Sequence, residues 1–139
     1  MNVVLNPPPA SIRLECGPVT ALDLALYAAS SSDHNPLHLD DEIALAAGFE
    51  RPVVHGMLTM AFAARLLTAH FGAQALRSLE TRFVSVAQRG ARIVLTGTLE
   101  RTEDLIAHYA LSAHNDAGEL LISGSAQISL RMSEEGEAK

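Results

Sequence analysis

The chain has 139 residues, of which 48% are apolar, and it carries a net charge of −6 with a pI near 5.4. This length and composition predict one domain over residues 1–139 with a substantial core. The acidic balance, without any run of lysine and arginine, excludes a nucleic-acid partner and an anionic-membrane surface. The single Cys16 excludes an internal disulfide framework and is consistent with a reducing compartment.

The chain contains no segment that predicts export or membrane insertion. Its first residues lack the basic and apolar parts of a secretory signal. The longest apolar stretch, around residues 57–67, is interrupted by Arg65 and is too short to cross a bilayer. We therefore expect a cytoplasmic protein with no membrane partner. Three consecutive prolines predict an extended arm over residues 1–10, and the charged residues 133–139 predict a disordered tail.

Two short helices are predicted in the first third of the chain, after a short edge strand over residues 12–15. Thr20 and Asp23 are typical of a capped helix start. Asn35-Pro36 ends this helix, because a residue before proline is displaced from the helical region. Asp40 predicts the cap of a second helix that runs through residue 47, and Gly48 suits the left-handed position after its end.

Residues 56–71 predict a long helix that is apolar on nearly every side. Its apolar residues are Met57, Leu58, Met60, Ala61, Phe62, Ala63, Leu66 and Leu67. A helix of this kind is expected to be buried on every side. The rest of the chain must therefore wrap around it.

Four runs with strand periodicity follow the long helix and predict the wrapping sheet. They cover residues 79–86, 92–99, 105–112 and 120–130, with short turns between successive runs. We expect them to pair in chain order as an antiparallel meander, with Gly97 and Gly124 letting the sheet approach the helix closely. The predicted architecture is α+β, a long central helix wrapped by a curved antiparallel sheet. Because such a sheet has two open edges, we expect a homodimer.

Asp33 and His38 are the candidate catalytic pair. They lie five residues apart on either side of Asn35-Pro36, where a turn can bring both side chains toward one point. An imidazole beside a carboxylate suits proton transfer near neutral pH. The alternative is that Asp33 caps a turn and His38 bonds the backbone. Asn35 either initiates the turn or orients one of the two side chains.

Gly56 is the third candidate, because it opens the long helix. The unpaired N–H groups and the positive dipole end of a helix N-terminus can stabilise a developing negative charge. The alternative is a glycine needed only for a tight turn. The preceding His55 is interpreted as a buried structural histidine. A metal site built from His34, His38, Asp40, Asp41 and His55 is not expected, since their spacing matches no ligand set.

Two motifs together resemble the MaoC-type, (R)-specific enoyl-CoA hydratase and 3-hydroxyacyl dehydratase family. They are Asp33-x-Asn35-Pro36-Leu37-His38-x-Asp40 and Arg51-Pro52-Val53-Val54-His55-Gly56-Met57-Leu58. The resemblance implies the hot-dog fold and a dimer. It implies that Asp33 and His38 form the catalytic pair, that Asn35 supports them, and that the Gly56 N–H forms the oxyanion hole for the thioester carbonyl.

The resemblance also implies a lyase of fatty acid metabolism. The expected reaction is reversible hydration of trans-2-enoyl-CoA to (R)-3-hydroxyacyl-CoA, with coenzyme A entering as part of the substrate and with no metal or other cofactor. Three alternatives stay open: a 3-hydroxyacyl-ACP dehydratase acting on acyl-carrier-protein thioesters, a hot-dog acyl-CoA thioesterase, and a non-catalytic acyl-binding subunit. The chain departs from the family pattern at Ser32, Val86 and Ala91, which bears on substrate preference more than on chemistry.

Overall fold

The structure is a computed structural model that describes residues 7–131. The predicted tail over residues 133–139 and the first six residues of the predicted arm lie outside the described residues. Residues 7–10 precede the first strand without helical or strand structure, as an extended arm requires. Among the described residues, no helix has the length and apolar character needed to span a membrane.

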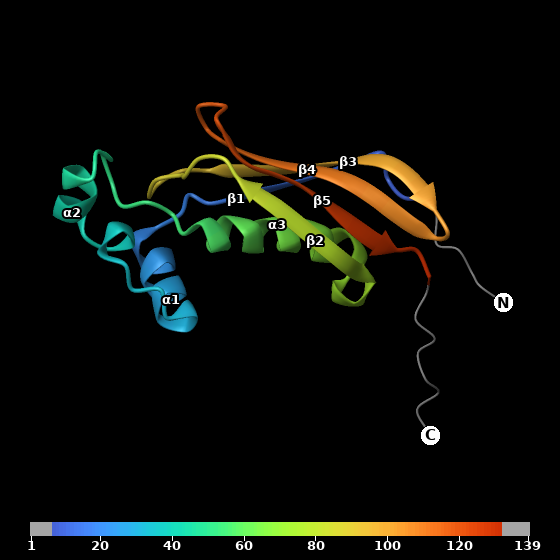
Figure 1. The fold of residues 1–139 in the computed structure, drawn as a ribbon, viewed down its shortest axis with the longest axis horizontal. Helices are drawn as coiled ribbons and strands as arrows, with labels where there is room; N and C mark the ends of the chain where they lie inside the picture. Colours follow the sequence, from blue (N-terminus) through green and yellow to red (C-terminus); the bar gives the residue numbers. More distant parts are fainter. Residues whose placement is uncertain (1–6, 132–139) are drawn as a thin grey trace, which may run out of the picture.

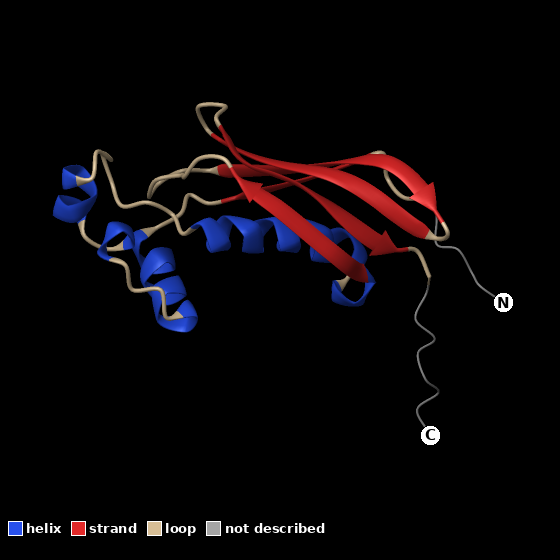
Figure 2. Ribbon diagram, viewed as in Figure 1, coloured by secondary structure: helices blue, strands red, loops and turns tan. Residues whose placement is uncertain are grey.

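A five-stranded antiparallel sheet lies over one long helix (Figures 1 and 2). The strands are β1 (Ser11–Cys16), β2 (Leu76–Phe83), β3 (Ile93–Glu103), β4 (Ile106–Asn115) and β5 (Leu120–Ser129). The long helix is α3 (Gly56–Phe71). At the end of the molecule near the start of α3 lie α1 (Ala21–Ser31), the 3-10 turn η1 (Pro36–His38) and α2 (Asp41–Ala46) (Figure 1). A second 3-10 turn, η2 (Ala73–Ala75), joins α3 to β2. The predicted α+β class is confirmed.

The strands do not pair in the predicted order. The sheet order is β1-β3-β4-β5-β2, so β3, β4 and β5 form a meander while β2 pairs with β5. The connection from β2 to β3 is therefore a crossover along residues 84–92 rather than a short turn. Along it, the Val84 N–H donates to the Leu121 carbonyl at 2.9 Å, and Val54 donates to Ala87 at 2.8 Å. These bonds tie the crossover both to β5 and to the loop before α3.

The long helix begins and ends as predicted but is not buried on every side in the single chain. Its buried residues, Thr59, Ala63, Leu66 and Leu67, share one face. Met57 is 55% exposed. The sheet covers one side of α3 only (Figure 1), so one face packs into the core and the opposite face stays open.

Local capping explains where the two shorter helices begin. Thr20 and Asp23 form a capping box, in which each side chain accepts a hydrogen bond from the other residue's backbone N–H. Asp40 accepts from the N–H groups of Glu42 and Ile43. Gly48 follows α2 with φ +96°, a conformation that favours glycine. Both predicted starts are confirmed.

The two glycines of the sheet serve strand packing rather than contact with the helix. A Cβ on Gly124 would collide with the backbone carbonyl of Glu80 on β2. A Cβ on Gly97 would lie 2.8 Å from the Ile12 side chain on β1. The expectation that these glycines bring the sheet close to the helix is therefore wrong. They let neighbouring strands and their side chains approach one another.

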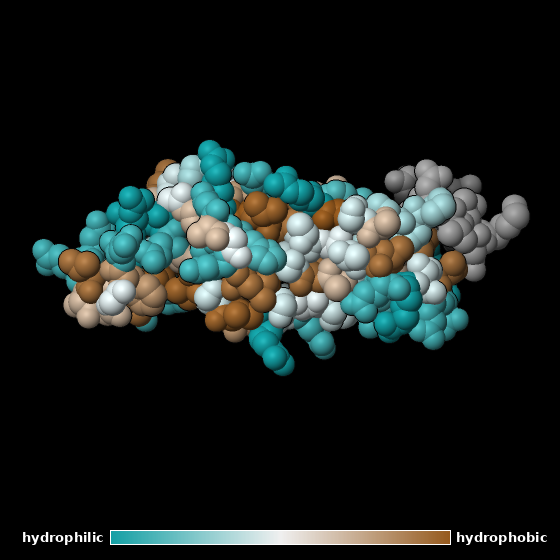
Figure 3. All heavy atoms as spheres, turned by 90° about the horizontal axis from the view of Figure 1, so that it is seen from above, coloured by the Kyte–Doolittle hydropathy of each residue, from teal (hydrophilic) through white to brown (hydrophobic). Residues whose placement is uncertain are grey.

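The outer face of the sheet shows polar and apolar side chains interspersed (Figure 3). On this face, the hydroxyls of Thr96 on β3 and Ser112 on β4 lie 2.8 Å apart and are hydrogen-bonded. The core lies on the other face, where Ile93, Leu95 and Tyr109 are almost fully buried against α3. Buried residues alternate with partly exposed ones along β4 and the first half of β3, which fixes the face that meets the helix.

Candidate active site

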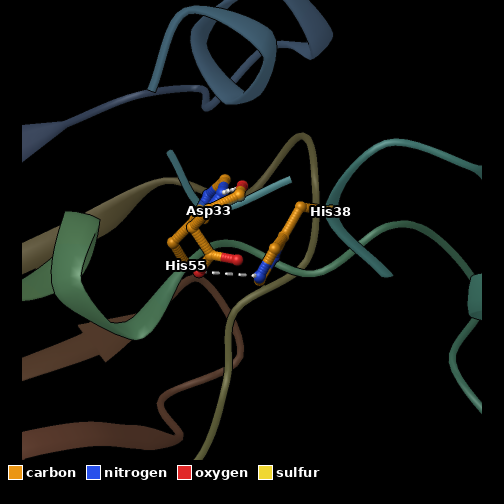
Figure 4. A group of neighbouring side chains, drawn as sticks. All are labelled: Asp33, His38 and His55. Carbon is orange, nitrogen blue, oxygen red and sulfur yellow. Dashed lines mark hydrogen bonds and ion pairs between the residues drawn. The ribbon is translucent and has the colours of Figure 1, made fainter. Parts of the chain in front are cut away.

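The structure brings the Asp33 carboxylate and the His38 imidazole together. Helix α1 ends at Ser31, and Ser32 adopts a left-handed conformation with φ 61° that turns the chain. The turn η1 then returns the chain, so that His38 Nε2 lies 3.6 Å from Asp33 Oδ2 (Figure 4). The Asp33 side chain is 50% exposed and that of His38 is 12% exposed. The pair is therefore open to solvent on its Asp33 side.

Asn35 supports this arrangement through the backbone. Its side-chain oxygen accepts from the Leu37 N–H at 3.0 Å, which caps η1. Its own N–H donates to Asp33 Oδ1 at 3.4 Å. Asn35 thus holds the Asp33 carboxylate with its main chain and the turn that carries His38 with its side chain. Both contacts are those of a turn-initiating asparagine.

The environment of His38 fixes its tautomer. His38 Nδ1 lies 2.8 Å from the carbonyl oxygen of Val53. A carbonyl only accepts hydrogen bonds, so Nδ1 carries a hydrogen and donates it. In the neutral ring, Nε2 is then the unprotonated nitrogen, and it faces Asp33. Nε2 is therefore the atom through which His38 can take up and release a proton.

His55 joins these two residues, although sequence reasoning did not place it in the site. It is 1% exposed and sits immediately before α3. Its Nε2 lies 3.2 Å from the Asp33 carbonyl oxygen, and its ring stacks on that of His38 with centroids 3.6 Å apart (Figure 4). Burial lowers the pKa of His55, which keeps its ring neutral.

Gly56 places the open N-terminus of α3 directly beside His55. No side chain caps this helix, so the N–H groups of its first turn point outward with the positive end of the dipole. Gly56 does not have a positive φ, so the backbone conformation does not require glycine. Instead, a Cβ at Gly56 would lie 3.3 Å from the Phe83 ring. The close approach of the Phe83 ring to Gly56 therefore explains this glycine better than the need for a tight turn does.

Asp33, His38 and His55 also bring one potential metal-binding atom each within 4.8 Å of one another. The two imidazole rings are stacked with an interplanar angle of 17°. A nitrogen lone pair lies in the plane of its ring, so the lone pairs of two nearly parallel rings do not point at one metal position. His38 Nδ1 and His55 Nε2 are each directed at a backbone carbonyl. This donor set is a poor fit to the geometry of a metal centre.

Two acidic residues of the sequence-based metal hypothesis have structural roles elsewhere. Asp40 caps α2 through its side-chain oxygen. Asp41 forms an ion pair with Arg89, with an Nη1–Oδ1 distance of 2.7 Å. Neither residue contributes to the group formed by Asp33, His38 and His55.

Comparison with known proteins places this geometry in a family. The model for the MaoC like domain matches residues 7–115. The mouse peroxisomal multifunctional enzyme type 2 is 32% identical over 126 residues, which cover 88% of this chain and 16% of that enzyme. The mitochondrial 3-hydroxyacyl-[acyl-carrier-protein] dehydratase of Arabidopsis thaliana is 42% identical over 72 residues, which cover 52% of this chain and 43% of that protein. The matches thus span less than half of both relatives.

A solved structure resembles the whole fold. The (R)-hydratase from A. caviae, described as involved in PHA biosynthesis, superposes with a TM-score of 0.79 at 28% identity. The superposition covers 86% of this chain and 92% of that one. The predicted hot-dog arrangement of helix and sheet is confirmed by this likeness.

Proposed function

The chain belongs to the MaoC-like family, and on that premise we propose that it catalyses the reversible hydration of trans-2-enoyl-CoA to (R)-3-hydroxyacyl-CoA. One observation carries the proposal. The Asp33 carboxylate and the His38 Nε2 face each other at 3.6 Å, beside the uncapped N-terminus of α3. An acid/base pair next to hydrogen-bond donors is what addition of water to a polarised acyl group requires.

The N-terminus of α3 has the role of polarising the thioester. The carbonyl oxygen accepts a hydrogen bond from the Gly56 N–H, which draws electron density from carbon 3 and stabilises the enolate-like charge that develops on the oxygen. Loss of one such donor costs roughly 10²–10³ in rate in other enzymes. A Cβ on Gly56 would lie 3.3 Å from the Phe83 ring, so a larger residue there would crowd the start of α3, where the thioester is proposed to bind.

Asp33 and His38 have the role of holding and activating the water. The water oxygen forms a bond to carbon 3 while one of its protons passes to the pair. A proton is delivered to carbon 2, the carbon–carbon double bond is lost, and the pair returns to its starting protonation state. No electrons are transferred, so the reaction requires no redox cofactor. Coenzyme A takes part only as the thiol portion of the substrate.

A dehydratase acting on 3-hydroxyacyl-ACP is the second candidate. It uses the same residues in the reverse direction, and the Arabidopsis relative is named for that activity. The net charge of −6 disfavours docking of an acidic carrier protein, but coenzyme A is also an anion, so net charge does not separate the two substrates. A thioesterase or a non-catalytic acyl-binding subunit has no need of the facing Asp33 and His38.

Hydration of crotonyl-CoA tests the proposal. The purified protein should remove the conjugated enoyl absorbance and yield the (R)-3-hydroxy product. Asp33→Asn and His38→Ala should each lower kcat by at least about 10²-fold, the contribution of a positioned acid or base. His34→Ala is the matched control, because His34 lies in the same loop but outside the group of Asp33, His38 and His55.

The other outcomes separate the alternatives. Release of free coenzyme A without hydration would identify a thioesterase and refute the proposal. Turnover of 3-hydroxyacyl-ACP with no turnover of the coenzyme A thioester would favour the carrier-protein substrate. Hydration that survives both Asp33→Asn and His38→Ala would place the chemistry elsewhere.

We also propose that the chain works as a homodimer. The edge strand β2 and the crossover after it carry three exposed apolar residues, namely Phe83, Val84 and Val86, and Met57 of α3 is exposed as well. Exposed apolar residues on an open sheet edge favour pairing with another chain. Light scattering of the purified protein should give twice the 14.8 kDa mass of one chain. A mass of one chain, with activity retained, would contradict the dimer.

A further inference from the structure

His55 contacts both members of the acid/base pair, yet it is too deeply buried to meet substrate. It is 1% exposed and packs against three residues from the segment 27–38. Its Nε2 is directed at the Asp33 carbonyl, one face of its ring lies on His38, and Tyr27 of α1 meets it edge-on with centroids 4.7 Å apart. These contacts raise the question of why a polar residue is used there.

The hydrogen bond to Asp33 determines the tautomer of His55. The acceptor is a carbonyl oxygen 3.2 Å from Nε2, so Nε2 carries the hydrogen. Burial lowers the pKa of the ring, which therefore remains neutral. Nδ1 is then a lone pair, and within the described residues it is buried without any hydrogen-bond partner.

An unpaired buried nitrogen is unfavourable, which makes the choice of histidine informative. A phenylalanine would place a somewhat larger ring against Tyr27 and His38 without the unpaired nitrogen and its desolvation cost. A glutamine would supply the N–H without the ring. Histidine provides both a flat ring for His38 and a donor for the Asp33 backbone, in a ring smaller than that of tyrosine or tryptophan.

We propose that His55 is a positioning residue, which sets the separation of Asp33 and His38 by holding the first through its backbone carbonyl and the second by ring stacking. This rests on the proposed function. The stacked ring fixes the plane of His38, while the Val53 carbonyl fixes its rotation. The N–H of His55 fixes the main chain of Asp33 from across 22 residues of sequence. The two side chains thus remain at the distance across which they share one water.

Two complementary variants separate the two contacts. His55→Phe keeps a stacking ring and removes the donor, whereas His55→Gln keeps a donor at the position of Nε2 and removes the ring. We expect each to lower kcat on crotonyl-CoA by at least about tenfold with KM changed less than about threefold, because small displacements of reacting groups cost rate more than binding. Thermal unfolding of each variant is measured alongside.

The kinetic outcomes decide for or against the proposal. A variant that keeps the wild-type kcat would overturn it, since the contact removed would then be unnecessary. A loss of activity that matches the fraction of unfolded protein would also overturn it, because His55 would then serve the fold only. A fall in kcat in both variants, with the folded fraction preserved, supports it.

A measurement on the unaltered protein is independent of activity and of whether the variants fold. Nitrogen-15 NMR of the neutral ring should show His55 with a hydrogen on Nε2 and none on Nδ1. Ring-current shifts should mark His38 as stacked. A hydrogen on Nδ1, or an unstacked His38, would overturn the proposal. Absence of hydration with both NMR features present would instead refute the proposed function.

Discussion

Arg89 and Asp41 form a bidentate ion pair, in which both terminal nitrogens of the guanidinium group donate to the carboxylate. Nη1 donates to Oδ1 at 2.7 Å and Nη2 donates to Oδ2 at 3.1 Å, a two-pronged pair that joins the crossover after β2 to the start of α2. The Arg89 N–H also donates to the Pro52 carbonyl at 2.8 Å. Through the ion pair and this backbone hydrogen bond, Arg89 joins α2 to the loop that leads to His55 and Gly56.

The Asp41–Arg89 pair should make stability depend on pH in acid. Its hydrogen bonds from Arg89 lower the pKa of the Asp41 carboxyl below its ordinary value. A carboxyl whose pKa is lower in the folded state stabilises the fold above its unfolded pKa, and the contribution disappears as pH falls through the folded pKa. Asp41→Asn should therefore lower the thermal midpoint near neutral pH, and the difference from wild type should shrink below about pH 4.

Thermal unfolding at a series of pH values in low salt checks this prediction. Arg89→Lys is the matched variant, because lysine keeps the charge but cannot form the two-pronged bond. It should lie between wild type and Asp41→Asn. A difference between wild type and Asp41→Asn that stays constant down to about pH 2 would contradict the assigned role of the ion pair.

Asn35→Ala should weaken the turn that carries His38. It removes the oxygen that accepts from the Leu37 N–H, and loss of such a cap costs about 1 kcal/mol of unfolding free energy. We expect kcat for hydration to fall by about tenfold, because His38 would be less well held opposite Asp33. Asn35→Ser, which keeps a side-chain acceptor without adding charge, should retain most of the activity. Equal activity of all three proteins would show that the cap does not position His38.

Gly56→Ala should impair catalysis more than stability. The helical backbone tolerates alanine, which raises helix stability by about 1 kcal/mol relative to glycine. The new Cβ would lie 3.3 Å from the Phe83 ring, at the start of α3 where the thioester is proposed to bind. We expect kcat/KM to fall by at least about tenfold while the thermal midpoint is unchanged or higher. The double variant Gly56→Ala with Phe83→Leu tests whether crowding against the Phe83 ring causes the loss of activity. Full activity of Gly56→Ala would refute close approach of substrate there.

Gly124→Ala should destabilise the sheet. An added Cβ collides with the Glu80 carbonyl, which belongs to the backbone of β2 and cannot rotate away. Overpacking of this kind costs about 1–3 kcal/mol of unfolding free energy. Urea unfolding measures it, with the neighbouring exposed Ser125→Ala as control, which should change stability by less than about 0.5 kcal/mol. A Gly124→Ala protein as stable as the control would mean that β2 shifts freely along β5.

Helix boundaries followed from the sequence because caps are local. The capping box of Thr20 and Asp23, the Asp40 cap and the glycine that opens α3 each act within a few residues of the helix they start. Strand periodicity likewise located the strands and gave the buried faces of β3 and β4, but the run predicted over residues 79–86 is displaced from β2 (Leu76–Phe83), which has no fully buried residue. It did not give the partners, since alternation along a strand does not say which strand lies beside it. The pairing of β2 with β5 was therefore missed.

The candidate site likewise has one part that was predictable from the sequence and one part that was not. Asp33, Asn35 and His38 lie within six residues, so the turn that joins them and the motif they form are visible in the sequence. His55 reaches Asp33 across 22 residues and stacks on His38 through a loop that the crossover after β2 holds in place. Such contacts depend on how the loop before α3 packs against α1 and η1. The sequence by itself thus indicated the helices, the strands and the proximity of Asp33 and His38, while the tertiary structure decided the strand order and brought His55 to these two residues, because both arise from packing between segments distant in the chain.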